Sequence, residues 1–395
     1  MVKTNVPRLR FREFDGEWNK KNLSKLTDIK DGTHSSPKYQ EKGYSLVTSK
    51  NLQNGHIDFS NTSKISEEDY DSINKRSLVE SDDIIFGMIG TIGNPVLIKD
   101  GGFAIKNVAL IKHSYKLDSY FVLNFLLSNS FIKHIEMNNE GGTQKFISLN
   151  NIRTCPLNIP SKDEQQKIGS FFAKLDQLIE LQTQKLEQLK KLKRGFLQKM
   201  FPQDGESVPR LRFSGFTGEW KSGFLGDKCD ITMGQSPNSK NYTNDSKQNI
   251  LVQGNADISK GKIFPRIYTS EITKISKKSE IIMTVRAPVG ELAVNQFDNV
   301  VIGRGVASLS GNVFDYFLLT RIKENGIWNR VSSGSTFDAV NASDIKSVKL
   351  YIPKNNEQQK IGGFFSKLDQ LINNQSKKIE ALKQQKKAYL QKTFI

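Results

Sequence analysis

The chain is poor in cysteine, histidine and long apolar runs, and each scarcity excludes a class of protein. Its 395 residues contain two cysteines, Cys155 and Cys229, and four histidines. Two distant thiols make neither a disulfide framework nor a metal-ligand spacing, so we expect a reducing cytoplasm and no bound metal. No apolar run reaches roughly 18 residues and the first residues lack an apolar segment, so neither a transmembrane span nor a signal peptide is predicted.

Motifs that carry chemistry are also missing. The sequence has no GxxxxGK[ST] loop for ATP, no HExxH zinc motif and no nucleophilic serine or cysteine elbow. None of its 11 prolines precedes an aspartate, which removes the commonest start of a nuclease carboxylate motif. The sequence IGNPV at 92–96 lacks the second proline and the aromatic residue of an adenine methyltransferase site. We therefore expect no catalytic residue and no cofactor in this chain.

Positive charge, in contrast, is abundant. The chain has 58 Lys and Arg against 41 Asp and Glu, which gives a net charge of +17. An excess of this size points to a polyanionic partner such as nucleic acid. A generally basic surface without that role is the alternative.

Two sequence motifs each occur twice. VPRLRFREFDGEW at 6–18 returns as VPRLRFSGFTGEW at 208–220. EQQKIGSFFAKLDQLI at 164–179 returns as EQQKIGGFFSKLDQLI at 357–372, and the likeness continues to Phe201 and Phe394. The blocks between the motifs, about 19–160 and 221–353, differ strongly in sequence. The repeated motifs therefore form a duplicated frame, whereas the blocks between them are not duplicated in sequence. This suggests two related tasks on two different targets.

Each long motif is predicted to be one helix. Neither has an internal proline, both are rich in good helix formers, and Pro202 follows the first. Apolar residues recur at alternating steps of four and three, which is a coiled-coil seam with a period of about 3.5. Additional apolar residues such as Phe171, Leu178 and Leu192 widen this stripe, leaving room for a third or fourth helix.

The seam of each helix is interrupted near its middle by a glutamine, Gln182 or Gln375. If the helices pair antiparallel, these two residues face each other and fix the register. The alternative is that each faces solvent or an outside partner. Antiparallel pairing makes the helices a rod of roughly 55 Å, which could hold two readers over half-sites about one to two turns of B-DNA apart.

Both variable blocks combine predicted strands with a predicted helix, at 118–137 and at 314–331. The fold class is therefore α+β, with two mixed α/β domains separated by two long helices in an antiparallel coiled coil, and a pseudo-twofold internal repeat. The expected segments are a first recognition domain (1–160), a first helix (161–201), a second domain (202–353) and a second helix (354–395).

Polar loops fall at matching places in the two blocks, and they are the candidate site. They combine glycine with side chains that can bond base edges or phosphates. For any one residue, an ordinary surface loop is the alternative. The candidates are Thr33, His34, Ser35, Ser36, Lys38, Tyr39, Lys50, Asn51, Gln144 and Lys145 in the first block, and Gln235, Ser236, Gln253, Asn255, Arg286, Arg304, Ser335 and Thr336 in the second.

The duplicated EQQKIGxFFxKLDQLI helices and VPRLRFxxFxGEW linkers resemble the specificity subunit of bacterial type I restriction-modification enzymes over essentially the whole chain. The resemblance implies that each block reads one half of a bipartite double-stranded DNA site with a nonspecific spacer. It implies two partner methyltransferase subunits that use S-adenosylmethionine, and two restriction subunits that use ATP and Mg²⁺. This chain would then be non-catalytic. A coiled-coil adaptor with only nonspecific DNA binding, and a self-contained methyltransferase or nuclease, are the alternatives.

Overall fold

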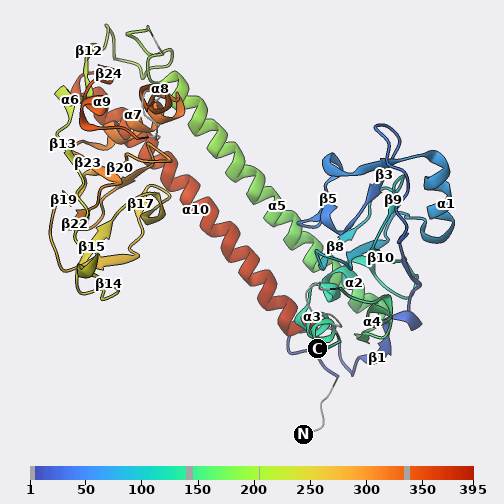
Figure 1. Ribbon diagram of the computed structural model, residues 1–395. Coiled ribbons are helices and arrows are strands. Elements are labelled where there is room, and N and C mark those ends of the chain that lie inside the picture. Colours follow the sequence, from blue (N-terminus) through green and yellow to red (C-terminus); the bar gives the residue numbers. More distant parts are fainter. Residues whose placement is uncertain (1–4, 139–145, 204, 333–338) are drawn as a thin grey trace. The chain divides into compact units, whose positions relative to one another are not determined.

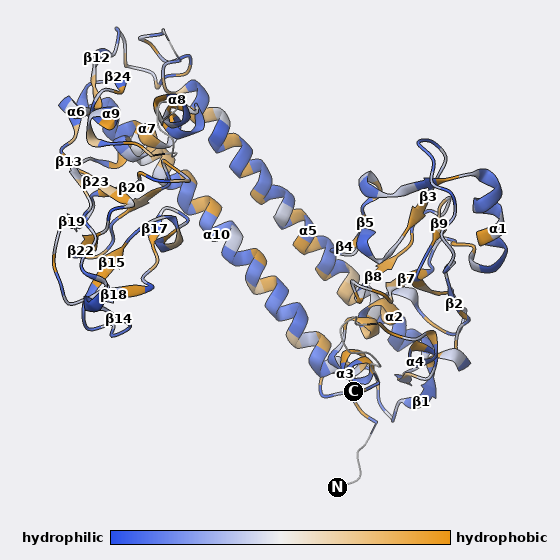
Figure 2. Ribbon diagram, viewed as in Figure 1, coloured by the Kyte–Doolittle hydropathy of each residue, from blue (hydrophilic) through white to orange (hydrophobic). Residues whose placement is uncertain are grey.

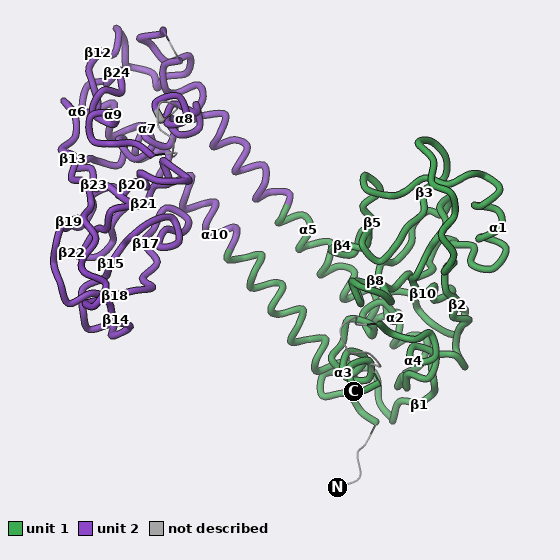
Figure 3. Tube along the Cα trace, viewed as in Figure 1, with its two compact units in different colours: residues 1–183, 377–395 green, residues 184–376 purple. Residues whose placement is uncertain are grey.

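The computed structural model describes residues 5–138, 146–203, 205–332 and 339–395 (Figure 1). The chain forms two compact units, one of residues 1–183 and 377–395, the other of residues 184–376 (Figure 3). Each unit contains one variable block, the start of one long helix and the end of the other. The four predicted segments are thus grouped by packing into two bodies. Among the described residues, no helix combines the length and apolarity needed to cross a membrane.

The first unit contains a four-stranded antiparallel sheet in the order β2-β10-β7-β8 and a mixed sheet in the order β6-β3-β9. Strand β1 pairs with β11, and β4 pairs with β5. The strands are β1 (Asn19–Asn22), β2 (Ile29–Asp31), β3 (Tyr44–Val47), β4 (Leu52–Gln53), β5 (His56–Ile57), β6 (Ser63–Ile65), β7 (Ile84–Gly87), β8 (Gly93–Leu97), β9 (Ala104–Ile105), β10 (Val108–Ile111) and β11 (Pro156–Ile159). The helices are α1 (Glu67–Ser77), α2 (Ser119–Leu126), α3 (Asn129–Met137) and α4 (Leu149–Arg153).

The second unit contains a six-stranded sheet in the order β13-β23-β20-β21-β17-β16 and a five-stranded sheet in the order β14-β18-β15-β22-β19. Strand β12 pairs with β24. The strands are β12 (Lys221–Phe224), β13 (Ile231–Met233), β14 (Tyr242–Thr243), β15 (Asn249–Val252), β16 (Ile258–Ser259), β17 (Lys262–Ile263), β18 (Ile267–Thr269), β19 (Ile275–Lys277), β20 (Ile281–Thr284), β21 (Leu292–Val294), β22 (Asn299–Ile302), β23 (Val306–Leu309) and β24 (Lys349–Ile352). The helices are α6 (Leu225–Lys228), α7 (Val313–Glu324), α8 (Ile327–Ser332) and α9 (Ala342–Lys346).

The two blocks share one fold despite their different sequences. The order β2-β10-β7-β8 matches β13-β23-β20-β21, and the parallel pair β3-β9 matches β15-β22. The pairs β1-β11 and β12-β24 close the two blocks in the same way. The predicted α+β class with an internal repeat is confirmed.

Each predicted block helix is in fact two helices. In the first unit, α2 ends before Leu127, and the side chain of Ser128 then accepts the backbone N–H of Phe131 to begin α3. In the second unit, Gly326 adopts a positive φ of 67° between α7 and α8. A local cap and a left-handed glycine thus interrupt segments whose composition alone favours a single helix.

The long helices are α5 (Lys162–Lys199) and α10 (Asn355–Thr393), as predicted to within a few residues. Apolar residues recur along both between polar ones (Figure 2). In the first unit, Phe171 packs against Tyr389 with ring centroids 5.4 Å apart, and Lys386 pairs with Asp176 at 2.7 Å. Position numbers rise along one helix as they fall along the other, so the helices are antiparallel here.

The second unit repeats this antiparallel pairing. The rings of Phe196 and Phe364 are 5.1 Å apart, and Lys193 pairs with Asp369 at 2.6 Å. Gln182 belongs to the first unit and Gln375 to the second, so their predicted facing pair stays a prediction.

The linker motif joins the two long helices within the first unit. Arg10 donates from Nε and Nη2 to both carboxylate oxygens of Glu164, at 2.7 Å each, and from Nη1 to the carbonyl of Gly16. Next to it, the N–H of Leu9 donates to the carbonyl of Lys392 near the end of α10. The linker therefore holds the first turn of α5 beside the last turn of α10.

The second unit makes the same clamp with its own copies of the motifs. Arg212 donates to Glu357 at 2.6 and 2.7 Å and to the carbonyl of Gly218 at 2.6 Å. The N–H of Leu211 donates to the carbonyl of Lys199 at the end of α5. Both glutamates are 1% exposed, and each is the third residue of its helix.

The glutamine that follows each of these glutamates bonds the backbone just before its helix. Gln165 donates to the carbonyl of Pro160 at 3.2 Å, and Gln358 donates to that of Pro353 at 2.8 Å. One turn later Ile168 and Ile361 are buried in the two main cores, together with Phe172 and Phe365. The repeated EQQKIGxFF motif thus combines an ion pair to the linker, a hydrogen bond to the proline carbonyl before the helix, and buried apolar side chains.

We predict that Arg10→Ala lowers the free energy of unfolding by about 3 kcal/mol, because it leaves the buried Glu164 without its partner. The free energy of unfolding of Arg10→Lys should lie between those of the wild type and Arg10→Ala, since lysine keeps the charge but cannot form both hydrogen bonds of the guanidinium. The matched control is Arg8→Ala in the same linker, where the side chain is exposed and a change within about 0.5 kcal/mol is expected. Urea unfolding followed by circular dichroism measures all three; equal losses for Arg8 and Arg10 would contradict the clamp.

Both cysteines are free and buried. Burial raises the pKa of the Cys155 thiol to about 12, and burial, helped by nearby Asp315, raises the pKa of the Cys229 thiol to about 12. Since the thiolate is the reactive form, we predict no reaction with a disulfide reagent in the native chain near pH 8. Titration in denaturant should reveal both thiols, whereas rapid native labelling would show that a core opens readily.

Candidate nucleic-acid interface

In the first unit, the loop after β2 lies against the turn that precedes β10. The N–H of Thr33 donates to the carbonyl of Ile105 at 3.0 Å, and the N–H of Asn107 donates back to Thr33 at 3.2 Å. Lys106 Nζ donates to Ser36 Oγ at 2.6 Å. The fold thus adds Lys106 and Asn107 to the predicted loop. Sequence reasoning missed both, although Asn107 opens a predicted strand.

A buried carboxylate holds the centre of this loop. One ring nitrogen of His34 bonds Asp31 Oδ2 at 2.7 Å and the other bonds Asn107 Oδ1 at 2.9 Å, while Arg76 contacts Asp31 Oδ1. Burial would raise the pKa of Asp31, but the hydrogen bond from His34 and the charge of Arg76 together hold it below its usual value. Asp31 therefore stays ionised and fixes His34, whose ring remains exposed.

The predicted reader Asn51 is used internally instead. Its Oδ1 accepts the N–H and the hydroxyl of Thr48 at 2.9 Å, and its Nδ2 donates to the carbonyls of Asp58 and Asn61 at 3.3 Å. The side chain is buried, so its role is to shape the turn Ser49–Asn51. Lys50 on the same turn is exposed and remains a candidate.

Most other candidates of the first block lie at the surface. Thr33 is half-buried, and the exposed members are Ser35, Ser36, Lys38 and Tyr39. The hydroxyl of Ser49 donates to the carbonyl of Asn107 at 3.2 Å, which joins the turn Ser49–Asn51 to the turn before β10, against which the loop after β2 lies. These loops therefore form one polar surface.

The second unit builds the same junction from different residues. The N–H of Gln235 donates to the carbonyl of Ile302 at 2.9 Å, and the N–H of Arg304 donates to Ser236 Oγ at 3.1 Å. The hydroxyl of Thr273 donates to the carbonyl of Gln235. The loop after β13 thus meets the turn between β22 and β23, as the loop after β2 meets the turn before β10.

One glycine in each unit makes this approach of two backbones geometrically feasible. A Cβ on Gly32 would lie 2.3 Å from the carbonyl oxygen of Ile105, and a Cβ on Gly234 would lie 2.1 Å from that of Gly303. Any side chain would push the loops apart. Close packing therefore explains why the polar loops at 31–39 and 233–242 each contain a glycine.

Four predicted residues of the second block line one pocket of about 340 Å³: Ser236, Gln253, Arg286 and Arg304, with Gly305 as the fifth lining residue. The two arginine side chains are exposed, and the other two candidates are half-buried. Asn255 is exposed on the neighbouring turn Asn255–Asp257.

Four other candidates, Gln144, Lys145, Ser335 and Thr336, lie outside the described residues. The residues that follow those two segments occupy equivalent places. Phe146 bridges to Ile89 after β7, and Ala339 bridges to Arg286 after β20.

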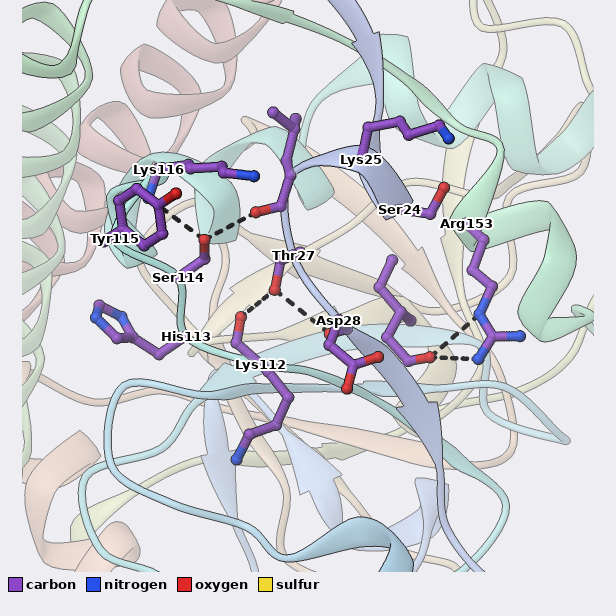
Figure 4. Close-up of a pocket in the computed structure, with 12 residues that line it drawn as sticks. Ser24, Lys25, Thr27, Asp28, Lys112, His113, Ser114, Tyr115, Lys116 and Arg153 are labelled. Atoms are coloured by element: carbon purple, nitrogen blue, oxygen red, sulfur yellow. Dashed lines mark hydrogen bonds between the residues drawn. The ribbon is translucent and has the colours of Figure 1, made fainter.

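A larger pocket of about 610 Å³ opens at the opposite end of β2 and β10 (Figure 4). Its main cations are occupied internally. Lys112 donates to Asp83 at 2.5 Å and to Glu80 at 2.7 Å, and Arg153 donates to the carbonyl of Ile29. This pocket is therefore a weaker candidate than the loops. In the described part of the chain, no group of three His, Cys, Asp or Glu side chains is placed to hold a metal ion.

Comparison with known proteins identifies the family of the chain. The family model described as the type I restriction modification DNA specificity domain matches residues 15–191 and again 217–384. A provisionally named MjaX type I restriction enzyme specificity subunit of Methanocaldococcus jannaschii is 25% identical, over 97% of this chain and 94% of its own length. The MjaIX specificity subunit of the same organism is 34% identical over 28% of this chain and 26% of its own length.

Solved structures share the fold. The S subunit of a type I restriction-modification system from M. genitalium matches with a TM-score of 0.62 and 18% identity, covering 99% of both chains. A chain from work on complex assembly and conformational transition of the type I R-M system matches with a TM-score of 0.65 and 20% identity, covering 96% of this chain and 98% of that one. Because the family model covers both variable blocks and most of both long helices, the chain belongs to the family of type I restriction-modification DNA specificity subunits.

Proposed function

We propose that the chain reads an asymmetric DNA site of two parts separated by a nonspecific spacer, with one variable block for each part. The observation that carries the proposal is the pair of equivalent loop junctions with unlike side chains. His34, Ser36 and Lys106 occupy the first junction, and Ser236 and Arg304 occupy the second. Since base edges are recognised by the pattern of donors and acceptors offered to them, unlike junctions imply unlike half-sites.

Binding combines charge attraction to the phosphate backbone with hydrogen bonds from the loops to the bases. The net charge of +17 attracts the phosphate backbone without regard to sequence and makes affinity fall with salt. The loops supply the directional hydrogen bonds that distinguish one base pair from another. Rigid mounting of the loops on β2, β10, β13 and β23 keeps these bonds in a fixed geometry.

The long helices have two roles: they determine the length of the DNA spacer, and they bind the partner subunits. Exposed leucines on the helices, Leu178, Leu181, Leu192 and Leu371, support docking because they are apolar and not covered. The partners are two adenine methyltransferase subunits, which use S-adenosylmethionine, and two restriction subunits, which use ATP and Mg²⁺. This chain itself is non-catalytic and works beside DNA in the cytoplasm.

The competing function is a coiled-coil adaptor that touches DNA only through charge. The two hypotheses differ in how binding depends on sequence. In complex with its methyltransferase partners, the chain should bind the duplex identified by methylome sequencing about 10³-fold or more tightly than a scrambled duplex at physiological salt. Equal affinity for both duplexes across a salt series would establish the adaptor instead.

A loop variant should alter one half-site alone. Lys106→Ala removes a cation held at the first junction, and we predict a loss of preference of about tenfold at one position of one half-site. The matched control is Lys20→Ala on β1, which removes an exposed lysine from a different element of the same unit. Methylome sequencing of hosts that express each variant with its partners gives the readout. A change spread evenly over both half-sites would contradict the division of labour.

Lengthening both helices should lengthen the spacer. Insertion of one heptad after Thr183 and one after Ser376 keeps the seam in phase and adds about 10 Å, which corresponds to about three base pairs. The control inserts the same seven residues at the exposed turn of Gly101 and Gly102 and should leave the spacer unchanged. An unaltered spacer in the helix variant would rule out the helices as its measure.

A further inference from the structure

The pocket of Ser236, Gln253, Arg286, Arg304 and Gly305 in the second unit is lined by side chains that carry hydrogen-bond donors. Gln253 Nε2 is buried and has no hydrogen-bond partner among the described residues. Ser236 Oγ accepts the backbone N–H of Arg304, so its own hydrogen is still available. Arginine offers donors and no acceptor. The pocket therefore matches a ligand edge that carries acceptors.

The backbone around Arg304 in this pocket is held in place by hydrogen bonds. The backbone N–H of Arg304 donates to Ser236 Oγ. In the two neighbouring residues, the N–H of Gly303 donates to the carbonyl of Val252, and the carbonyl of Gly305 accepts the N–H of Val285. A Cβ on Gly305 would lie 2.1 Å from the carbonyl oxygen of Gln253, so that glycine allows the turn to lie against β15. A fixed backbone suits selective recognition of one edge, which needs precise geometry.

At the equivalent place in the first unit, polar side chains form hydrogen bonds with one another. Register identifies it, because the N–H of Lys106 donates to Val47 as that of Gly303 donates to Val252. There Lys106 bonds Ser36, His34 bonds Asn107, and Thr48 bonds Asn51. The open set of donors thus distinguishes the second unit from the first.

In the major groove, guanine is the base whose edge presents two acceptors, O6 and N7, with no donor, whereas adenine pairs its N7 acceptor with an amino donor and thymine has O4 alone. The backbone phosphate also presents acceptors only. A planar guanidinium can bond O6 and N7 of guanine together. The fixed mount of Arg304 and the unpartnered amide of Gln253 favour the base, because a phosphate contact requires neither.

We propose that this pocket reads one guanine, with Arg304 on its O6 and N7 and with Gln253 and Arg286 completing the donor set. The half-site of the second block then contains an obligatory G·C pair. The inference rests on the proposed function and adds the chemical identity of one recognised base.

The test is a double-mutant cycle on the complex of the full chain with its methyltransferase partners. The target is first found by methylome sequencing, and each guanine of its half-sites is replaced singly by 7-deazaguanine, which lacks the N7 acceptor but still pairs with cytosine. For one guanine, the wild-type complex should lose about tenfold in affinity. The Arg304→Ala complex should bind the natural duplex more weakly and show no further loss at that guanine.

The matched control is Lys278→Ala, which removes a cation paired with Asp298, beside the end of β22 that is remote from Gly303. That complex should keep the tenfold sensitivity. Arg304 is exposed, so its replacement is compatible with folding, and Gln253→Leu provides a second variant that should reduce the same sensitivity.

Two results would overturn the inference while leaving the proposed function standing. One is that the wild-type complex binds its target specifically, but no 7-deazaguanine substitution lowers its affinity more than it lowers the affinity of the Arg304→Ala complex. The other is a uniform loss by Arg304→Ala on all duplexes with a shallower salt dependence, which identifies a phosphate contact. Failure of the wild-type complex to prefer its target over a scrambled duplex would instead remove the proposed function and this inference together.

Discussion

Arg10 with Glu164, and Arg212 with Glu357, form the same two-bonded ion pair, once in each unit. Both glutamates are almost completely buried, where an unpaired carboxylate would be strongly destabilising, so each depends on its arginine. Each also lies in the first turn of a long helix, where the helix dipole favours negative charge. Because the neighbouring residue of each linker bonds the end of the other helix, this single interaction fixes how a variable block joins its pair of helices.

Such a frame leaves the reading surface free to change. The clamp, the glutamine bonds to the preceding proline carbonyls and the buried Ile168 and Ile361 all come from the repeated motifs, while the loops that meet at the two junctions come from the variable blocks. What the junctions share is backbone geometry, set by Gly32 and Gly234 and by the register of the neighbouring strands. Side chains on that backbone can differ without disturbing the frame, and this accounts for a repeated scaffold that carries two unlike sets of polar residues.

The parts of the fold that could be predicted are those encoded by local pattern. Helices α5 and α10 and their antiparallel contacts follow from a repeat and a seam, and the buried strands follow from short β-branched runs. The break before α3 was missed because it depends on one capping serine, Ser128. Lys106 and Asn107 were missed because strand register brings them to the loop from a distant position. Asn51 was assigned by residue type, and only its buried hydrogen bonds reveal that it shapes the turn.

The division of the chain into units has a consequence for its synthesis. Residues 184–376 of the second unit are contiguous, so all of that unit has been translated before the first unit is complete. The first unit takes Leu390 and Phe394 into its core, and its linker bonds the carbonyl of Lys392. The domain translated first can therefore complete its aromatic core only after Leu390 and Phe394 have been made and have folded back onto it.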